Sequence, residues 1–394
     1  MLRNIIAFIK HKPGLTMGFL LSVSSLLLGI WAAALPAIKQ RLGLTNQTLG
    51  FSLLLSPVGA LTGVVLSSWL FSHIKVGKWL LAGPILQCLL FIEMVTVQYK
   101  LVFWLVLFAT GVIGFFNGVS INAVIDMIEK RYQKRIMSSC HGMYSLGGGI
   151  SAGLAAIFYS MHMAAAYQII IVAAVIISIL FYIRRHLLIH QVYIHSGSSL
   201  SAPPLSIIGL AFICFVSFMG EGSIADWSAI YLKESLHSTV AMASLGYGGF
   251  SVMMAIGRFN GDALIPETGP KKIVIAGSLI AASGFLLAIA FHYKITAIAG
   301  FSLVGIGYAC IVPILFSAAA NVPGISPTVG ISSIASGGLI GFLFGPSVIG
   351  LVAEKVNLAA GLSFVMVLST IASVVATRNK FLAADTNAAF VELK

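Results

Sequence analysis

A succession of apolar runs, each close to the length of a membrane-spanning helix, constrains this chain more than any other feature. A helix that crosses the hydrocarbon core needs about 20 mostly apolar residues, and twelve segments meet that requirement. Charged residues make up 9% of the chain, against about 25% in soluble domains. We therefore expect an all-α membrane protein with twelve transmembrane helices. The expected spans are 14–37, 47–71, 78–97, 101–126, 137–160, 165–184, 204–232, 240–258, 272–291, 295–320, 329–350 and 357–377.

The positive charge of the chain lies in the short connections between these spans. The net charge is +12, but the basic residues gather on no polar domain, so nucleic acid is not an expected partner. If successive spans alternate in direction, 17 of the 23 Lys and Arg lie on the side of the N-terminus and 6 on the other side. Positively charged loops stay in the cytoplasm. We therefore expect a monomeric, multi-pass protein of the bacterial inner membrane, surrounded by lipid, with both termini in the cytoplasm.

The longest polar connection, residues 186–204, lies at the midpoint of the chain. It carries His186, His190 and His195, which could bind a metal ion. Their spacing is irregular and no acid or cysteine accompanies them, so a solvated linker is the favoured interpretation and no metal site is predicted. The predicted organisation is an N-terminal six-helix bundle (1–185), a cytoplasmic linker (186–204) and a C-terminal six-helix bundle (205–394).

The two halves match each other at an offset of about 194–196 residues. Several matches in the same chain order indicate a duplicated six-span unit, although each match alone is weak. Two parallel repeats form one of the known transporter architectures, with the solute site between the halves near the middle of the membrane. The matched pairs include Trp31 and Trp227, Gly63 and Gly257, and Gly111 and Gly305.

Twelve spans, a central linker and a six-plus-six repeat together resemble the major facilitator superfamily. The connection after the eighth span, GRFNGDALIPETGPKK (257–272), is similar to the short loop motif of that superfamily, with Arg258 and Asp262 in the positions of its charged residues. The counterpart in the first half has Ser68 in place of the acid. The resemblance thus implies a gating role for Arg258 and Asp262, and leaves the matching clamp of the first half in doubt.

Three further stretches resemble a narrower group, the YbjJ-like inner-membrane proteins, a branch similar to the fucose permeases. This resemblance implies a transporter and brings no substrate with it. The stretches are NAVIDMIEKRY (122–132), SSCHGMYSLGGGISAG (138–153) and EGSIADWSAIYL (221–232).

The seventh span contains two carboxylates, Glu221 and Asp226, in otherwise apolar surroundings. An ionised acid at the centre of a membrane helix costs about 2.5–3.5 kcal/mol on insertion scales, so such residues normally face a polar cavity or a partner. A carboxyl group in a low dielectric can bind and release a proton near neutral pH. We predict that Glu221 faces the central cavity and Asp226 lies nearer the outer gate. The alternative for Glu221 is a permanent bond to a neighbouring helix.

Several polar and aromatic side chains are further candidates for the site. Trp31 and Trp227 could stack on a ring-shaped solute or belong to an interfacial aromatic belt. Asn117, in the middle of the fourth span, is the best neutral hydrogen-bonding candidate, and Tyr308 in the tenth span is a weaker one.

The cytoplasmic ends of the fourth and fifth spans carry a second polar group. Asn122, Asp126 and Glu129 follow one stripe of a helix, and we expect Asp126 to take part in gating. His141 pairs with Ser145 at the start of the fifth span and could join a proton relay, because histidine titrates in the physiological range. Structural ion pairs at the inner surface are the alternative, favoured for Glu129 with Arg131.

These features predict a secondary transporter that works by alternating access. We expect it to move a small polar solute, sugar-like or organic-acid-like, with the proton gradient as the driving force and no cofactor. The chain has neither a phosphate-binding loop nor a nucleophile with a base at useful spacing, so it is not expected to be an enzyme. The alternatives are proton-antiport efflux of amphipathic compounds and a receptor or scaffold that moves no solute.

Overall fold

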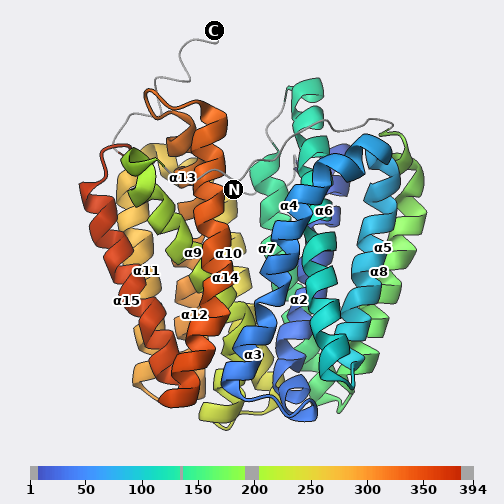
Figure 1. Cartoon of the computed structure of the whole chain (residues 1–394), viewed down its shortest axis with the longest axis vertical. Helices are drawn as coiled ribbons and strands as arrows, with labels where there is room; N and C mark the ends of the chain where they lie inside the picture. The colour runs from blue at the N-terminus through green and yellow to red at the C-terminus, as the bar shows by residue number, and fades with distance from the viewer. Residues whose placement is uncertain (1–7, 134–135, 191–203, 383–394) are drawn as a thin grey trace.

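The computed structural model of the chain describes residues 8–133, 136–190 and 204–382. Most of the predicted linker, including His195, lies outside the described residues. Apart from short turns, the described residues form helices arranged as two bundles side by side (Figure 1). The N-terminal bundle, blue to green, contains α2 (Lys12–Arg41), α3 (Asn46–Leu53), α4 (Leu55–His73), α5 (Val76–Thr96), α6 (Lys100–Tyr132), α7 (Met137–Ser160) and α8 (Ala165–Leu188).

The C-terminal bundle, yellow-green to red in Figure 1, follows the same course. Its elements are η1 (Leu205–Ile207), α9 (Ile208–Ile230), the π-helix η2 (Tyr231–Ser235), α10 (Val240–Thr268), α11 (Pro270–Ala290), α12 (Lys294–Tyr308), α13 (Ile311–Ala320), α14 (Pro327–Lys355) and α15 (Leu358–Arg378).

Two of the expected spans are each divided into two helices, and proline explains both divisions. Pro57 follows the break between α3 and α4, and Pro313 follows the break between α12 and α13. Proline has no backbone N–H and its ring clashes with the carbonyl four residues earlier, which kinks or breaks a helix at that point. For Pro57 that carbonyl belongs to Leu53, the last residue of α3. For Pro313 it belongs to Ala309, the residue that follows α12.

Eleven helical segments among the described residues are long and apolar enough to cross a membrane. The fifth expected span, 137–160, forms the 24-residue helix α7 but lies outside that set. Its sequence is rich in Gly and Ser, and it packs against α2 within its own bundle and α10 of the other. Because α7 faces protein on both of these sides, it has less need of the apolar surface that lipid demands.

Glycine contacts reproduce the duplication that the sequence offset predicts. A Cβ atom added to Gly111 of α6 would overlap the carbonyl oxygen of Ser56 in α4. At an offset of 194 residues, a Cβ on Gly305 of α12 would overlap the carbonyl oxygen of Phe250 in α10. Small residues let membrane helices approach this closely. The two bundles therefore use the same backbone contact, which confirms the pseudo-symmetric architecture.

The most extensive contacts between the bundles are those of α7 with α10 and of α14 with α3, and α2 also contacts α9 and α10. Helix α7 packs along α10 from Gly142, beside Phe259, to Ala152, beside Gly248. Helix α14 contacts α3 closely but α4 only slightly. We call the end at which α2 ends and α3 begins the distal end, and the end at which α2 begins and α15 ends the terminal end. On the side of α14 the halves are thus joined at the distal end, and α4 and α14 diverge towards the terminal end (Figure 1), whereas α7 stays packed on α10 as far as Gly142.

Candidate functional site

Glu221 of α9 forms a buried ion pair with Arg258 of α10. Arg258 Nη2 lies 3.4 Å from Glu221 Oε1, and the two side chains are 12% and 16% exposed. Arg258 Nη1 donates a hydrogen bond of 2.8 Å to Ser145 Oγ on α7. Since α7 belongs to the N-terminal bundle, Arg258 connects the two halves. We call Glu221, Arg258 and Ser145 the central triad.

The position of Arg258 corrects an expectation from the sequence. The eighth span was expected to end at residue 258, with Arg258 opening a loop, but α10 continues to Thr268. Arg258 therefore lies about one turn beyond the middle of a 29-residue helix. Its motif partner Asp262 lies in the same helix, and its side chain lies outside the described residues. In this structure the charged partner of Arg258 is the acid of the seventh span.

Gly220 and Gly222, on either side of Glu221, allow aromatic rings of neighbouring helices to pack closely against α9. Tyr308 of α12 lies against Gly220, and Phe342 of α14 lies against Gly222. The Tyr308 hydroxyl is 2.6 Å from Ser369 Oγ of α15. Tyr308, a predicted solute ligand, is thus bonded within the C-terminal bundle, while Glu221 remains free to face α10.

The titratable neighbours of the central triad come from both halves. Tyr144 of α7 and Tyr247 of α10 lie near both Glu221 and Arg258. His141, one turn before Ser145 on α7, lies near Arg258. The hydroxyl of Ser145 is 3.4 Å from the His141 carbonyl oxygen, so the predicted His141–Ser145 pair meets through the backbone. The structure therefore gathers His141, predicted as a relay residue, with Glu221 and a cation.

Asp226 and Trp227 lie further along α9, towards the distal end. Asp226 is partly buried and has no ion-pair partner within the described part of the chain. Trp227 is fully buried beside Gly350 of α14, and its Nε1 has no acceptor among the described residues. Trp31 is also buried, with its ring centroid 6.0 Å from that of Phe103. Their burial argues against an interfacial belt for both tryptophans.

Asn117 belongs to a polar cluster inside the N-terminal bundle. Its Oδ1 accepts a hydrogen bond of 3.1 Å from Trp79 Nε1, and its Nδ2 lies 3.4 Å from Gln87 Oε1. Both partners are on α5, so this amide links α5 to α6. Asn122, five residues further along α6, has a buried Oδ1 without a partner among the described residues. Asn117 is therefore occupied by helix packing, and Asn122 keeps an unused acceptor.

The acids of the predicted cytoplasmic stripe have separate surroundings. Asp126 forms an exposed ion pair of 2.7 Å with Lys130, one turn away on α6. Glu129 Oε1 accepts the backbone N–H groups of Ile136 and Met137, at 2.5 and 2.8 Å, and so caps the start of α7. A structural role was the favoured interpretation of Glu129, with Arg131 as its partner. The structure assigns this role to the cap and places Arg131 over the Tyr132 ring.

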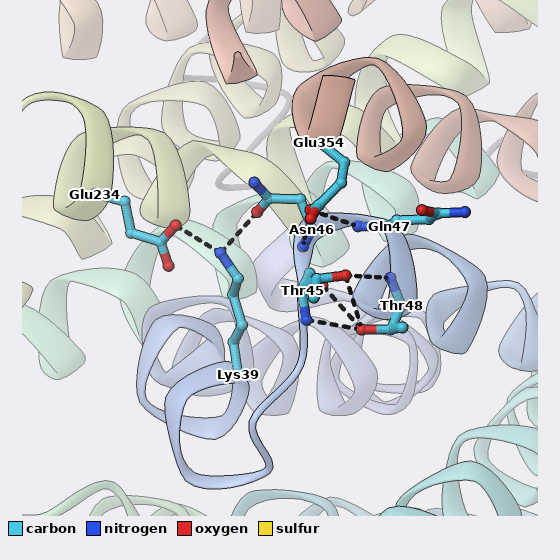
Figure 2. Close-up of polar contacts among 7 residues, drawn as sticks. All are labelled: Lys39, Thr45, Asn46, Gln47, Thr48, Glu234 and Glu354. Carbon is cyan, nitrogen blue, oxygen red and sulfur yellow. Dashed lines mark hydrogen bonds and ion pairs between the residues drawn. The ribbon is translucent and has the colours of Figure 1, made fainter. Parts of the chain in front are cut away.

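The distal end carries a second set of charges that join the halves. Lys39 Nζ, in the last turn of α2, lies 2.6 Å from Glu234 Oε2 of η2 and 2.6 Å from Asn46 Oδ1 of α3 (Figure 2). Glu354, near the end of α14, accepts the backbone N–H groups of Asn46 at 3.0 Å and Gln47 at 3.4 Å. We call Lys39, Asn46, Glu234 and Glu354 the distal latch.

Local structure places each member of the distal latch. The wide turn of η2, in which Leu236 N–H bonds to the Tyr231 carbonyl at 3.1 Å, presents Glu234 to Lys39. The first N–H groups of a helix lack intrahelical partners and carry partial positive charge, so a carboxylate such as Glu354 is favoured at the start of α3. Gly50 and Gly350 bring α3 and α14 into backbone contact beside it.

Two features could not be found from the sequence. One is the bond of Ser145 to the central triad, and the other is the entire distal latch. These groups pair only across the two halves, and sequence spacing carries no signal for such contacts. The continuation of α10 past Arg258 also contradicts a local signal, because Asn260-Gly261 is a pair typical of turns, yet both residues lie inside α10.

Comparisons with known proteins agree with the fold and show to which family the chain belongs. Residues 17–324 match the family model of the Major Facilitator Superfamily. An uncharacterised MFS-type transporter of Yersinia pestis is 31% identical over 351 residues, covering 88% of this chain and 90% of the relative. Membrane protein MosC of Rhizobium meliloti is 29% identical over 365 residues, covering 90% of this chain and 87% of that protein.

Solved structures show the same architecture. A bacterial homologue of the human lysosomal transporter Spinster, inward-facing and occupied, superposes with a TM-score of 0.72 at 12% identity, covering 94% of this chain and 97% of that one. The unoccupied inward-facing form gives a TM-score of 0.68 at 16% identity and covers 95% and 96%. Identities this low show the fold alone. The fold, the matched family model and the relative from Yersinia pestis together show that the chain is a membrane transport protein rather than an enzyme, and that it belongs to the major facilitator superfamily.

Proposed function

We propose that this chain is a proton-coupled secondary transporter of a small polar solute. The proposal rests on Glu221, a largely buried carboxylate paired at 3.4 Å with Arg258, which in turn bonds to Ser145 of the other half. A group that changes its charge at the contact between the halves can link proton uptake to their relative movement. Burial disfavours the charged carboxylate and Arg258 favours it, so a small change around the pair can move the proton.

The proposed membrane orientation follows from the distribution of basic residues. With Arg258 left out, because it lies inside α10, sixteen of the other 22 Lys and Arg are expected on the side of both termini, which the positive-inside rule makes cytoplasmic in the bacterial inner membrane. The terminal end is then the inner end, and the distal latch closes the outer end. On this orientation the structure is inward-facing, and alternating access requires the latch to open while α4 and α14 close together.

The finer features of the proposal come from the sequence. The solute is sugar-like or organic-acid-like, the proton gradient supplies the energy without a cofactor, and a monomer is the working unit. The halves that move are 1–185 and 205–394, and residues 186–204 connect them in the cytoplasm. The YbjJ-like branch, similar to the fucose permeases, is the proposed place within the superfamily.

Transport into proteoliposomes tests the proton path. A solute is first found by screening sugars and organic acids for thermal stabilisation of the purified protein. The Glu221→Gln variant, which cannot exchange a proton, should lose accumulation driven by a pH gradient but keep exchange of labelled for unlabelled solute. Glu93→Gln is the matched control, because Glu93 is an exposed acid of α5. Normal gradient-driven accumulation by Glu221→Gln would remove Glu221 from the proton path. Opposite pH gradients distinguish uptake from proton-antiport efflux.

A further inference from the structure

We propose that Arg258 is the binding group for a carboxylate of the solute, and that Glu221 occupies its place when the solute is absent. This inference rests on the proposed function and narrows its two solute classes to organic acids. Arg258 would thereby determine specificity, and Glu221 would be both its substitute ligand and the proton carrier.

The geometry of the ion pair leaves Arg258 with capacity for a better ligand. A charge-assisted N–H···O hydrogen bond is usually about 2.7–2.9 Å long, and arginine commonly binds a carboxylate through two parallel bonds. Glu221 instead approaches at 3.4 Å, through Oε1 alone. The guanidinium has five N–H donors, and its other hydrogen bond among the described residues is the one to Ser145 Oγ. A mobile carboxylate can align with this group in a way that Glu221, fixed on α9, does not.

The charges around the triad favour a monoanion over a neutral solute or a phosphate. Among the described residues, Arg258 is the one permanent cation near Glu221, Tyr144 and Tyr247. The other titratable neighbours, His141, Cys214 and Tyr308, lie around the same pair. A phosphate dianion would exceed the single positive charge, whereas one carboxylate matches it.

Charge balance then gives the coupling. With Glu221 ionised, the pair is neutral; a solute carboxylate adds one negative charge in a low-dielectric environment, where an uncompensated charge is costly. Uptake of one proton by Glu221, forming its O–H bond, restores neutrality. The central triad would therefore take one solute anion and one proton together, and release both when Glu221 returns to Arg258.

The position of Arg258 connects this exchange to the movement of the halves. Arg258 lies on α10, and its bond to Ser145 reaches α7 in the other bundle. A solute carboxylate on Arg258 competes with both Glu221 and Ser145. Binding therefore acts at the place where the halves are in contact.

Thermal stabilisation of the full chain in detergent tests the inference. The probes are acetate, lactate, gluconate and glucuronate, compared with the neutral acetamide, lactamide and glucose and with inorganic phosphate. We expect at least one carboxylate to stabilise the protein and its neutral counterpart to have no effect. The affinity of the protein for that carboxylate should rise as pH falls, by up to about tenfold per pH unit, which is the slope expected when one proton binds together with the ligand.

Variants separate the roles of the two residues. Glu221→Gln, uncharged like the protonated acid, should bind the carboxylate at least as tightly and without the pH dependence. Arg258→Gln should abolish binding, and Arg258→Lys, which keeps the charge but not the fork, should weaken it. Should Arg258→Gln fail to fold, Arg258→Lys and Glu221→Gln carry the test. Arg184→Gln, an exposed cation near the end of α8, should behave as wild type.

Four results would overturn the inference: no shift with any carboxylate, equal stabilisation by neutral counterparts, tighter binding of phosphate, or retained binding in Arg258→Gln. Failure of the proposed function is distinguishable. A carboxylate that binds through Arg258 but does not enter proteoliposomes contradicts transport alone. A neutral solute transported with protons through Glu221 contradicts the anion inference alone.

Discussion

The distal latch predicts that removal of a single charge opens the distal end. Lys39 is 11% exposed and Glu234 40% exposed, and their atoms lie 2.6 Å apart across the two halves. This attraction exists only in the closed state, because the partners separate when the distal end opens. Lys39→Gln or Glu234→Gln therefore destabilises the closed state and leaves the open state unaffected. Either variant should therefore shift the equilibrium between the two states towards the one with an open distal end.

The size of the shift follows from the geometry of the ion pair. Coulomb's law at an effective dielectric of about 20 gives about 6 kcal/mol for unit charges at this separation. Desolvation of Lys39 and ordering of both side chains offset most of this attraction. In exposed ion pairs the measured stabilisation is about 0.2–1 kcal/mol. Lys39 is largely buried and Glu234 is not, so about 1–2 kcal/mol is expected. At 1.36 kcal/mol per factor of ten, the ratio of open to closed states should rise about 5- to 30-fold.

Distance measurements between spin labels provide an assay that needs no solute. Labels on cysteines introduced at Tyr99 and Val356, both exposed at the distal end, report the separation of the halves. The four native cysteines are buried, so they should react little with the label. Either neutralised variant should increase the long-distance fraction, and high salt should do the same more weakly.

A charge exchange separates a latch from general damage. The double variant Lys39→Glu with Glu234→Lys should recover most of the closed fraction, with Asn46 turning its amide to donate instead of accept. Lys100→Gln is the control, because Lys100 contacts the Gly43 carbonyl within its own half. Unchanged distances in both single variants, or no recovery in the exchanged one, would refute the argument.

Three further predictions concern stability. Gly111→Ala and Gly305→Ala should each lower the free energy of unfolding by about 1–3 kcal/mol, because the added Cβ meets a backbone carbonyl. Gly118→Ala is the control and should not lower it, because Gly118 has open space around it. Equal melting temperatures of the three variants in detergent would contradict this prediction. Glu129→Ala should cost about 1–2 kcal/mol through loss of the α7 cap, visible as a lower melting temperature, while Glu93→Ala serves as the unaffected comparison. Asn117→Ala should cost about 1–3 kcal/mol because it leaves Trp79 Nε1 buried without its acceptor; a double variant with Trp79→Phe should be less unstable than the sum of the single variants, and simple additivity would argue against the bond.

The fold could be predicted from the sequence because a membrane imposes one length and one polarity on every spanning helix. The twelve apolar runs give the spans, and the offset of 194 residues between Gly111 and Gly305 gives the duplication. Pro57 and Pro313 give a local reason for the two interruptions, the missing N–H. The sequence alone does not distinguish them from Pro36, Pro84, Pro266 and Pro346, which lie inside undivided helices. The end of α10 was placed ten residues too early, at residue 258 instead of Thr268, because hydropathy falls where polar residues enter a helix that faces protein.

The sequence alone thus determined that Glu221 lies in an apolar span and needs a partner, since an isolated charge in hydrocarbon is too costly. Only the tertiary structure decided that the partner is Arg258, 37 residues away on α10 and bonded to Ser145 of the other half. The same holds for Lys39 and Glu234, which are 195 residues apart. Apolar length and periodicity are properties of a single segment, whereas the partner of a charge depends on which helices the packing of two bundles brings together.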